Sequence, residues 1–132
     1  MHEGGAVHLF AEGVAAHVVK ADVASLYPSL MRIFQIGPAS DHLGVLLSIL
    51  GRLTDLRLAH KDAARTAATG SIESNHHNAT QAAMKILINS AYGYMGAGSM
   101  ALFADSHAAD EVTRRGREIL NTVVEALRGR GM

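Results

Sequence analysis

Two stretches of apolar residues at helical spacing flank a short polar segment, and this pattern constrains the fold more than any other feature. Leucines recur every three or four positions in residues 43–58, and apolar side chains recur similarly in residues 84–95. Gly70 and the polar residues 71–77 lie between them, and such residues favour a reversal of the chain. The pattern predicts an antiparallel hairpin of two amphipathic helices, with residues 71–77 at its tip.

Short polar residues predict where the helices begin. Asp41 precedes the leucine-rich helix as its N-cap, and Asn78 with Gln81 resembles a capping box for the returning helix. Asp105 or Ser106 is expected to begin one more helix near the C-terminus. The buried side of that last helix is expected to consist of Val112, Ile119, Leu120, Val123 and Leu127.

The first 38 residues have a different pattern, with short apolar runs separated by glycines. Val7, Leu9 and residues 14–19 predict short strands, and the run 18–23 predicts a buried strand that ends at the carboxylate of Asp22. Ser25 follows as the expected cap of a short helix, which tolerates Pro28 in its first turn.

These elements predict an α+β fold that is mostly helical, organised in three units. Residues 1–38 form strands and a short helix, residues 39–97 form the helical hairpin, and residues 98–132 form the last helix. Hydrophobic residues make up 48% of the chain and charged residues 18%, which is typical of globular rather than disordered protein.

Composition narrows the classes of function. Cysteine is absent, which excludes disulfides and thiolate metal sites. The sequence contains no uncharged apolar run long enough to span a membrane, and no signal peptide is apparent. We therefore expect a cytoplasmic protein, nucleoid-associated if prokaryotic. Twelve Lys and Arg balance twelve Asp and Glu, which argues mildly against autonomous DNA binding. Of the eight histidines, His76 and His77 lie in the expected hairpin tip and the others are scattered along the sequence, so we expect surface histidines rather than a metal site.

Two rows of polar residues on the hairpin are candidates for binding an anion. Arg57 and Lys61 lie one helical turn apart and extend the apolar stripe, while Lys85, Asn89 and Tyr92 share one face of the returning helix. Cations on such a stripe are usually solvated surface residues, and an isolated acid at a strand end is usually a helix cap. An antiparallel hairpin, however, brings these rows together. With Asp22 at its base, it has room for a metal-bound triphosphate.

Two segments then resemble the motifs of one known family. Residues 22–29, Asp-Val-Ala-Ser-Leu-Tyr-Pro-Ser, resemble the first palm motif of family B DNA polymerases, D-x-x-S-L-Y-P-S. Residues 85–93, Lys-Ile-Leu-Ile-Asn-Ser-Ala-Tyr-Gly, resemble the fingers motif of that family, K-x-x-x-N-S-x-Y-G. Residues 1–38 then correspond to part of the palm, residues 39–97 to the fingers, and residues 98–132 to a palm helix.

The resemblance implies a role for each motif residue. Asp22 and the carbonyl of Val23 would bind the catalytic Mg²⁺ ions, of whose ligands only half are present. The triphosphate would be bound by Ser25, Leu26, Arg57, Lys61 and Lys85, with Asn89 ordering the same face. Tyr27 would lie under the sugar and exclude a 2′-hydroxyl group, and Tyr92 and Gly93 would lie against the nascent base pair. Gly4 and Gly5 would contact the template strand.

One departure from the family pattern limits the expected activity. The family's third palm motif contains an Asp-x-Asp pair, and no such pair occurs in these 132 residues. One carboxylate cannot hold both ions of a two-metal site. We therefore expect no polymerisation by this chain alone. Its expected partners are a DNA primer-template, deoxynucleoside triphosphates and the remainder of a polymerase, and self-association is a further expectation.

Two other classes of function remain open at this point. One is a non-catalytic module that binds nucleotides or single-stranded nucleic acid, and the other is a helical interaction domain. The first would bind triphosphate without turnover. The second would tolerate alanine at Arg57, Lys61 and Lys85.

Overall fold

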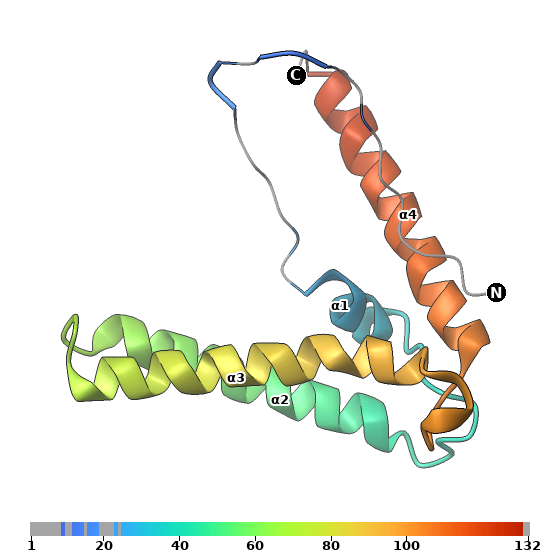
Figure 1. Cartoon of the computed structure of the whole chain (residues 1–132), viewed down its shortest axis with the longest axis horizontal. Helices are drawn as coiled ribbons and strands as arrows, with labels where there is room; N and C mark the ends of the chain where they lie inside the picture. The colour runs from blue at the N-terminus through green and yellow to red at the C-terminus, as the bar shows by residue number, and fades with distance from the viewer. Residues whose placement is uncertain (1–8, 10–11, 15, 19–22, 24, 131–132) are drawn as a thin grey trace.

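The part of the chain that the structure describes is helical. It is a computed structural model, and it describes residues 9, 12–14, 16–18, 23 and 25–130. The elements, in order, are α1 (Leu26–Ile33), α2 (Val45–Thr66), α3 (Ile72–Met95), the 3-10 turn η1 (Gly98–Met100) and α4 (Ser106–Arg128). Figure 1 shows α2 and α3 side by side as a long arm, with α1 against the arm near its base and α4 rising from that end.

The predicted helical hairpin is confirmed, but its tip lies earlier than expected. Ser71, in extended conformation, accepts a hydrogen bond from Ser74 N through its hydroxyl at 3.0 Å, so α3 already begins at Ile72. Gly70, with φ of 78°, makes the reversal just before it. The predicted tip at residues 71–77 is therefore wrong, and Asn78 lies inside α3 rather than in a capping box. Serine and asparagine are both favourable N-cap residues, and here Ser71 rather than Asn78 begins the helix.

Asp41 caps α2 from a distance of several residues. Gly44, with φ of 65°, holds the N-cap position, while the Asp41 carboxylate accepts bonds from Val45 N at 3.0 Å and Leu46 N at 2.7 Å. These backbone N–H donors, that of Leu46 above all, hold the pKa of Asp41 below its usual value. The prediction that Asp41 caps this helix is right in chemistry, although Gly44 holds the N-cap position.

A small apolar core joins the arm, α1 and α4. Its fully buried members are Leu30, Met31, Leu50, Ile88, Met95, Ala109 and Val112. Because α1 contributes two of them and packs against α2, α3 and α4, this eight-residue helix holds the base of the molecule together.

The C-terminal half of α4 is less covered than its sequence predicts. Val112 is buried and Ile119 is half-buried, but Leu120, Val123 and Leu127 remain between 38% and 41% exposed. Figure 1 shows the reason: this half of α4 extends away from the arm. No helix in the described part of the chain is long and apolar enough to cross a membrane.

The predicted α+β fold is wrong for the described residues, which contain no β-strand. Leu9, Val14 and Val18, which were expected in strands, are each at least 75% exposed. A strand forms only by pairing with another strand, and alternating apolar residues do not supply the partner. Residues 7, 15 and 19–22, which complete the expected strands, lie outside the described residues.

Two histidines meet across the hairpin, a contact that their spacing in the sequence does not predict. The Nδ1 atoms of His60 in α2 and His77 in α3 are 2.8 Å apart, so one ring donates a hydrogen bond to the other. Nearer the tip, the Ser74 hydroxyl donates to the Ala64 carbonyl at 3.3 Å. Both contacts follow from the register in which α2 packs against α3.

Asp105, in the loop before α4, bonds to the start of α4 and to the loop between α1 and α2. Its lowered pKa makes the stability of the fold sensitive to acid. Its carboxylate accepts bonds from Ala108 N at 3.0 Å, as the cap of α4, and from Ala39 N at 2.9 Å. These donors lower its pKa, the Ala108 N–H more than the Ala39 N–H. A lowered pKa means that the stabilisation is complete above the unfolded value of about 4 and disappears as the pH falls through the lower folded value.

We therefore expect Asp105→Asn to lower the melting temperature at pH 7 and to flatten its decline below about pH 4. The amide can accept at only one of its two positions, so one N–H loses its partner. Thermal unfolding followed by circular dichroism between pH 2.5 and 7 measures this. Asp62→Asn, which removes an exposed carboxylate 3.5 Å from Arg65, is the control. An unchanged pH profile in Asp105→Asn would contradict the expectation.

Candidate functional site

A small pocket lies between the start of α1 and the middle of α2. It has a volume of about 150 Å³. Its lining comprises Ser25, Pro28, Ser29, Arg32, Thr54, Arg57, Leu58 and Ile88. Two of these side chains carry guanidinium groups and none carries a carboxylate, so the pocket suits an anion.

Two buried polar atoms in this pocket have no hydrogen-bond partner among the described residues. They are the hydroxyl of Ser25 and Nε of Arg57. A buried donor without a partner costs about 1–3 kcal/mol, and a charged one costs more. A ligand with several acceptor oxygens would remove that cost once the two side chains turn to expose these atoms to the pocket.

The backbone before α1 presents Ser25 to the pocket. Ser25 occupies the N-cap position with φ of 51°, in the left-handed region, and its side chain does not cap the helix. The predicted side-chain cap is therefore wrong. The first backbone N–H groups of a helix have no intrahelical acceptor, so the start of α1 beside Ser25 favours an anion.

Arg57 reaches the pocket because it continues the inward face of α2. Leu53, half-buried, lies on the same face one turn earlier, and Leu50, fully buried, lies two turns earlier. The guanidinium therefore lies at the end of an apolar stripe, where it is half-buried. The structure places the other cations of the two predicted rows differently. The side chains of Lys61 and Lys85 are exposed and do not line this pocket.

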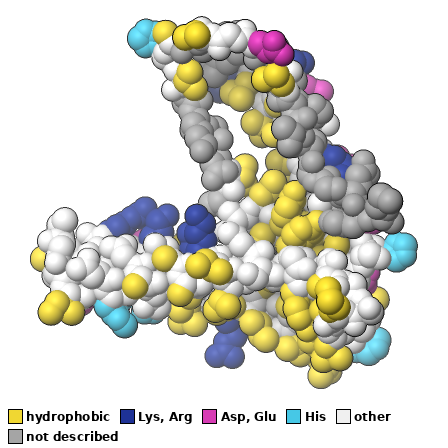
Figure 2. Space-filling model, viewed as in Figure 1, with side chains coloured by type: hydrophobic (Ala, Val, Ile, Leu, Met, Phe, Trp, Pro, Cys, Tyr) yellow, Lys and Arg dark blue, Asp and Glu magenta, His cyan; other side chains and the backbone are white. Residues whose placement is uncertain are grey.

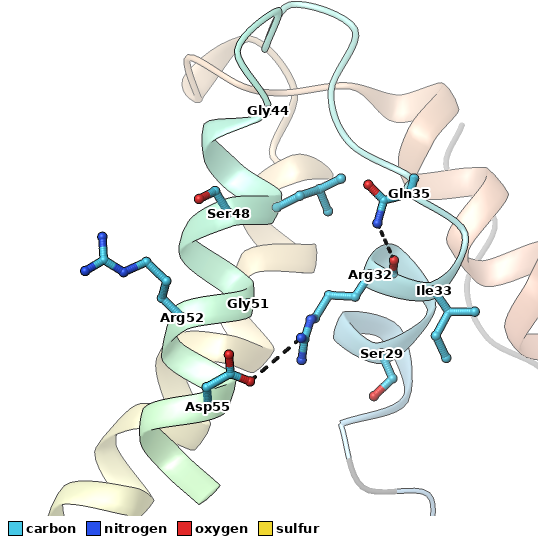
Figure 3. A pocket seen from close by; sticks show the side chains of 10 residues that line it. Ser29, Arg32, Ile33, Gln35, Gly44, Ser48, Gly51, Arg52 and Asp55 are labelled. Carbon is cyan, nitrogen blue, oxygen red and sulfur yellow. Dashed lines mark hydrogen bonds and ion pairs between the residues drawn. The ribbon is translucent and has the colours of Figure 1, made fainter. Parts of the chain in front are cut away.

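Lysines and arginines nonetheless gather on one side of the arm. Helices α2 and α3 carry Arg57, Lys61, Arg65 and Lys85, and also Arg52, whose side chain points away from α1 (Figure 3). Figure 2 shows most of the dark blue atoms of the arm along its upper edge, on the side of α1 and α4. A long anion bound at the pocket can thus extend along a positive edge.

Two tyrosines of the expected site touch. The ring centroids of Tyr27 in α1 and Tyr92 in α3 lie 4.4 Å apart at 39°. Burial raises the pKa of Tyr92, and the neighbouring Tyr27 and Asp110 raise it further. Asn89 and Gly93, on either side of Tyr92 in the sequence, occupy exposed positions of α3.

A larger, open hollow of about 860 Å³ lies between α1 and the first turns of α2. In Figure 3, Arg32 extends from α1 toward Asp55, 3.8 Å away, whereas Arg52 points away from α1. The Arg32 carbonyl accepts a bond from Gln35 Nε2 at 2.6 Å. Because Asp55 brings a carboxylate to this hollow, it suits an anion less well than the smaller pocket does.

The family model for DNA polymerase family B matches residues 32–131 of the chain. This chain belongs to DNA polymerase family B. Among curated proteins, DNA polymerase 1 of Sulfurisphaera ohwakuensis is 30% identical over 91% of this chain. DNA polymerase 1 of Pyrococcus abyssi is 28% identical over 98% of it, and the DNA polymerase alpha catalytic subunit of Oryza sativa subsp. japonica is 30% identical over 83%.

The chain covers only a small part of these family B relatives. It aligns with 17% of the Sulfurisphaera protein, 19% of the Pyrococcus protein and 8% of the rice protein. No solved structure matches the fold.

Part of the expected family B site lies outside the described residues. Asp22, Gly4 and Gly5 belong to that part, while Val23 is described and half exposed. The described residues contain no group of three or more His, Asp or Glu side chains that could hold a metal ion.

Sequence reasoning missed Ser29, Arg32 and Thr54 as lining of the pocket. A signal was present for each of them: Ser29 and Arg32 follow Ser25 at intervals of four and three residues, on one helix face. Thr54 had the same signal, because it lies three residues before Arg57 on α2, and its hydroxyl donates to the Leu50 carbonyl at 2.7 Å.

Proposed function

We propose that this chain provides the nucleotide-binding fingers and part of the palm of a DNA-directed DNA polymerase. Its substrates are deoxynucleoside triphosphates and a primer-template, and the remainder of the polymerase is its partner. Residues 1–38 and 98–132 belong to the palm and residues 39–97 to the fingers. Membership of DNA polymerase family B supports the class of reaction.

The observation that carries the proposal is the pair of unpartnered polar atoms in the small pocket. The Ser25 hydroxyl and Arg57 Nε are buried there without a hydrogen-bond partner. A phosphate group offers several acceptor oxygens and a negative charge, which suits an arginine and an exposed helix start together. The volume of about 150 Å³ admits one phosphoryl group with water.

The rest of the triphosphate would follow the positive edge of the arm. Lys61 and Lys85 lie on α2 and α3, and both side chains are exposed to a ligand. Asn89 lies one turn beyond Lys85. Cations placed along the leaving phosphates would neutralise the charge that develops there during transfer.

The tyrosine pair would lie under the sugar and the base. Tyr27 directly follows the two residues, Ser25 and Leu26, that we assign to the triphosphate. The resemblance of residues 22–29 to the first palm motif implies that this ring would lie against C2′ of the ribose and leave no space for a hydroxyl group there. Tyr92, in contact with Tyr27, and Gly93 would then lie beside the base pair.

Asp22 and the Val23 carbonyl are the proposed ligands of magnesium. A Mg²⁺ ion bound with the triphosphate would supply charge neutralisation at the transferring phosphoryl group. Since Asp22 lies outside the described residues, its position enters no other step of the proposal.

The experiment measures whether the 132-residue chain binds dATP and which part of the nucleotide it recognises. We expect saturable binding by isothermal titration calorimetry, with displacement by inorganic tripolyphosphate. Ser25→Ala should weaken dATP binding about tenfold, the value of one hydrogen bond to a charged group. Ser40→Ala, in an exposed loop, should bind as the wild type does.

Two results would count against the proposal. One is the absence of saturable dATP binding. The other is binding that a single-stranded oligonucleotide displaces and tripolyphosphate does not, because a backbone-tracking groove rather than a triphosphate pocket would then be present.

A further inference from the structure

Helix α4 lies against α1 at a glycine, and the ring of Tyr27 fills the space that a side chain would occupy. Gly116 is buried in the middle of α4. A Cβ atom there would lie 3.2 Å from Cε1 of Tyr27, 3.6 Å from Cδ1 of Leu30 and 3.8 Å from Cδ2 of Leu26. Carbon atoms in favourable contact lie about 3.5–4.0 Å apart, so only the tyrosine contact is too short.

Glycine in the interior of a helix requires a compensating reason. It costs about 1 kcal/mol relative to alanine because of its backbone freedom. At Gly116 this cost is offset by packing, because the absence of a side chain lets the Tyr27 ring contact the backbone of α4.

Two other contacts limit how far the Tyr27 ring and α4 can adjust. Tyr92 lies with its ring centroid 4.4 Å from that of Tyr27, at the short end of the range for aromatic pairs. The guanidinium of Arg115 lies over the ring of Phe34, 4.5 Å from its centroid, and ties α4 to the end of α1. An added methyl group at residue 116 must therefore move the tyrosine ring rather than the helix.

We propose that Gly116 is a positioning residue that fixes the Tyr27 ring and so sets the preference for deoxynucleotides over ribonucleotides. The inference rests on the proposed function, in which Tyr27 lies beneath the sugar. It adds a residue that touches no part of the nucleotide. Gly116 acts only through the space it leaves for Tyr27.

The test compares Gly116→Ala with Gly51→Ala. Both glycines lie inside long helices, but a Cβ at Gly51 would meet only the Arg32 guanidinium at 3.9 Å, an ordinary contact. Binding of dATP and ATP to each full-length variant gives the preference as a ratio of dissociation constants. We expect the ratio to fall about fivefold in Gly116→Ala, the lower end of the effect of an overpacked contact, and to stay constant in Gly51→Ala.

A second readout does not need nucleotide. The ring proton resonances of Tyr27 and Tyr92 should shift in Gly116→Ala and not in Gly51→Ala, because only the first variant moves the stacked pair. Tyr27→Ala provides the third comparison. Without the ring, Gly116→Ala should leave the dATP to ATP ratio unchanged, as expected when one residue acts through another.

The outcomes separate this inference from the proposed function. A wild-type chain that binds no dATP would overturn both. A wild-type chain that prefers dATP, with the same ratio in Gly116→Ala, would overturn only the role of Gly116. An equal change of the ratio in the presence and absence of the Tyr27 ring would also overturn it.

Discussion

Arg57→Met is expected to weaken dATP binding by about ten- to a hundredfold, the effect of losing charge-assisted hydrogen bonds to a phosphate. The variant keeps an unbranched apolar stem in place of the arginine stem, so the packing around the pocket is largely retained. Without ligand, its free energy of unfolding should stay equal to that of the wild type or rise. The reason is that Arg57 Nε is buried without a partner, which destabilises the free protein.

This opposite response of affinity and stability distinguishes a binding residue from a structural one. Calorimetric titration with dATP gives the affinity, and urea unfolding without nucleotide gives the stability. Arg52→Met is the matched control, because Arg52 lies on the same helix and points away from α1 (Figure 3). A loss of stability in Arg57→Met, with unchanged dATP affinity, would show that Arg57 serves the fold.

Leu30→Ala is expected to lower the free energy of unfolding by about 2–5 kcal/mol. Leu30 is 1% exposed and lies in the core that joins α1 to α4 and the arm. Removal of its side chain leaves a cavity that the short helix α1 cannot close without moving Tyr27 and Ser25. A change of this size is a large part of the stability of a small domain.

Urea unfolding followed by far-ultraviolet circular dichroism measures this loss. Leu43→Ala is the control, since Leu43 is 89% exposed and its replacement should change stability by less than about 0.5 kcal/mol. Equal midpoints for Leu30→Ala and the wild type would mean that α1 is not packed as described.

The helices of this chain could be predicted from its sequence because their signals are local. Apolar spacing marks α2 and α3, and Asp41 and Asp105 mark two helix starts through bonds to backbone N–H groups within a few residues. The same local reasoning placed the hairpin tip wrongly, because Ser71 and Asn78 are both acceptable caps and only one can begin the helix.

Long-range features could not be predicted from such signals. The strands expected at Leu9, Val14 and Val18 would need partners that apolar alternation does not specify. The contact of His60 with His77 depends on the register of the two helices, which the apolar stripe fixes only to within a turn. Gly116 is similar, since nothing near it in sequence indicates that a tyrosine ring lies against it.

The candidate site lies between these two cases. Arg57 was singled out because it extends an apolar stripe, and the structure places it in the same pocket as Ser25. Whether Lys61 and Lys85 reach the same ligand depends on long exposed side chains, whose conformations neither spacing nor the backbone determines.

The arm is long compared with the helix against which it packs, so a small rotation at its base moves its tip a long way. Helices α2 and α3 contain 22 and 24 residues, whereas α1, against which their base packs, contains only eight. A helix of that greater length is about 36 Å long, so a rotation of about ten degrees at the base carries the far end through about 6 Å. Such a rotation would carry the tip of the hairpin through a distance as large as a nucleotide base, while residues at its base would move little (Figure 1).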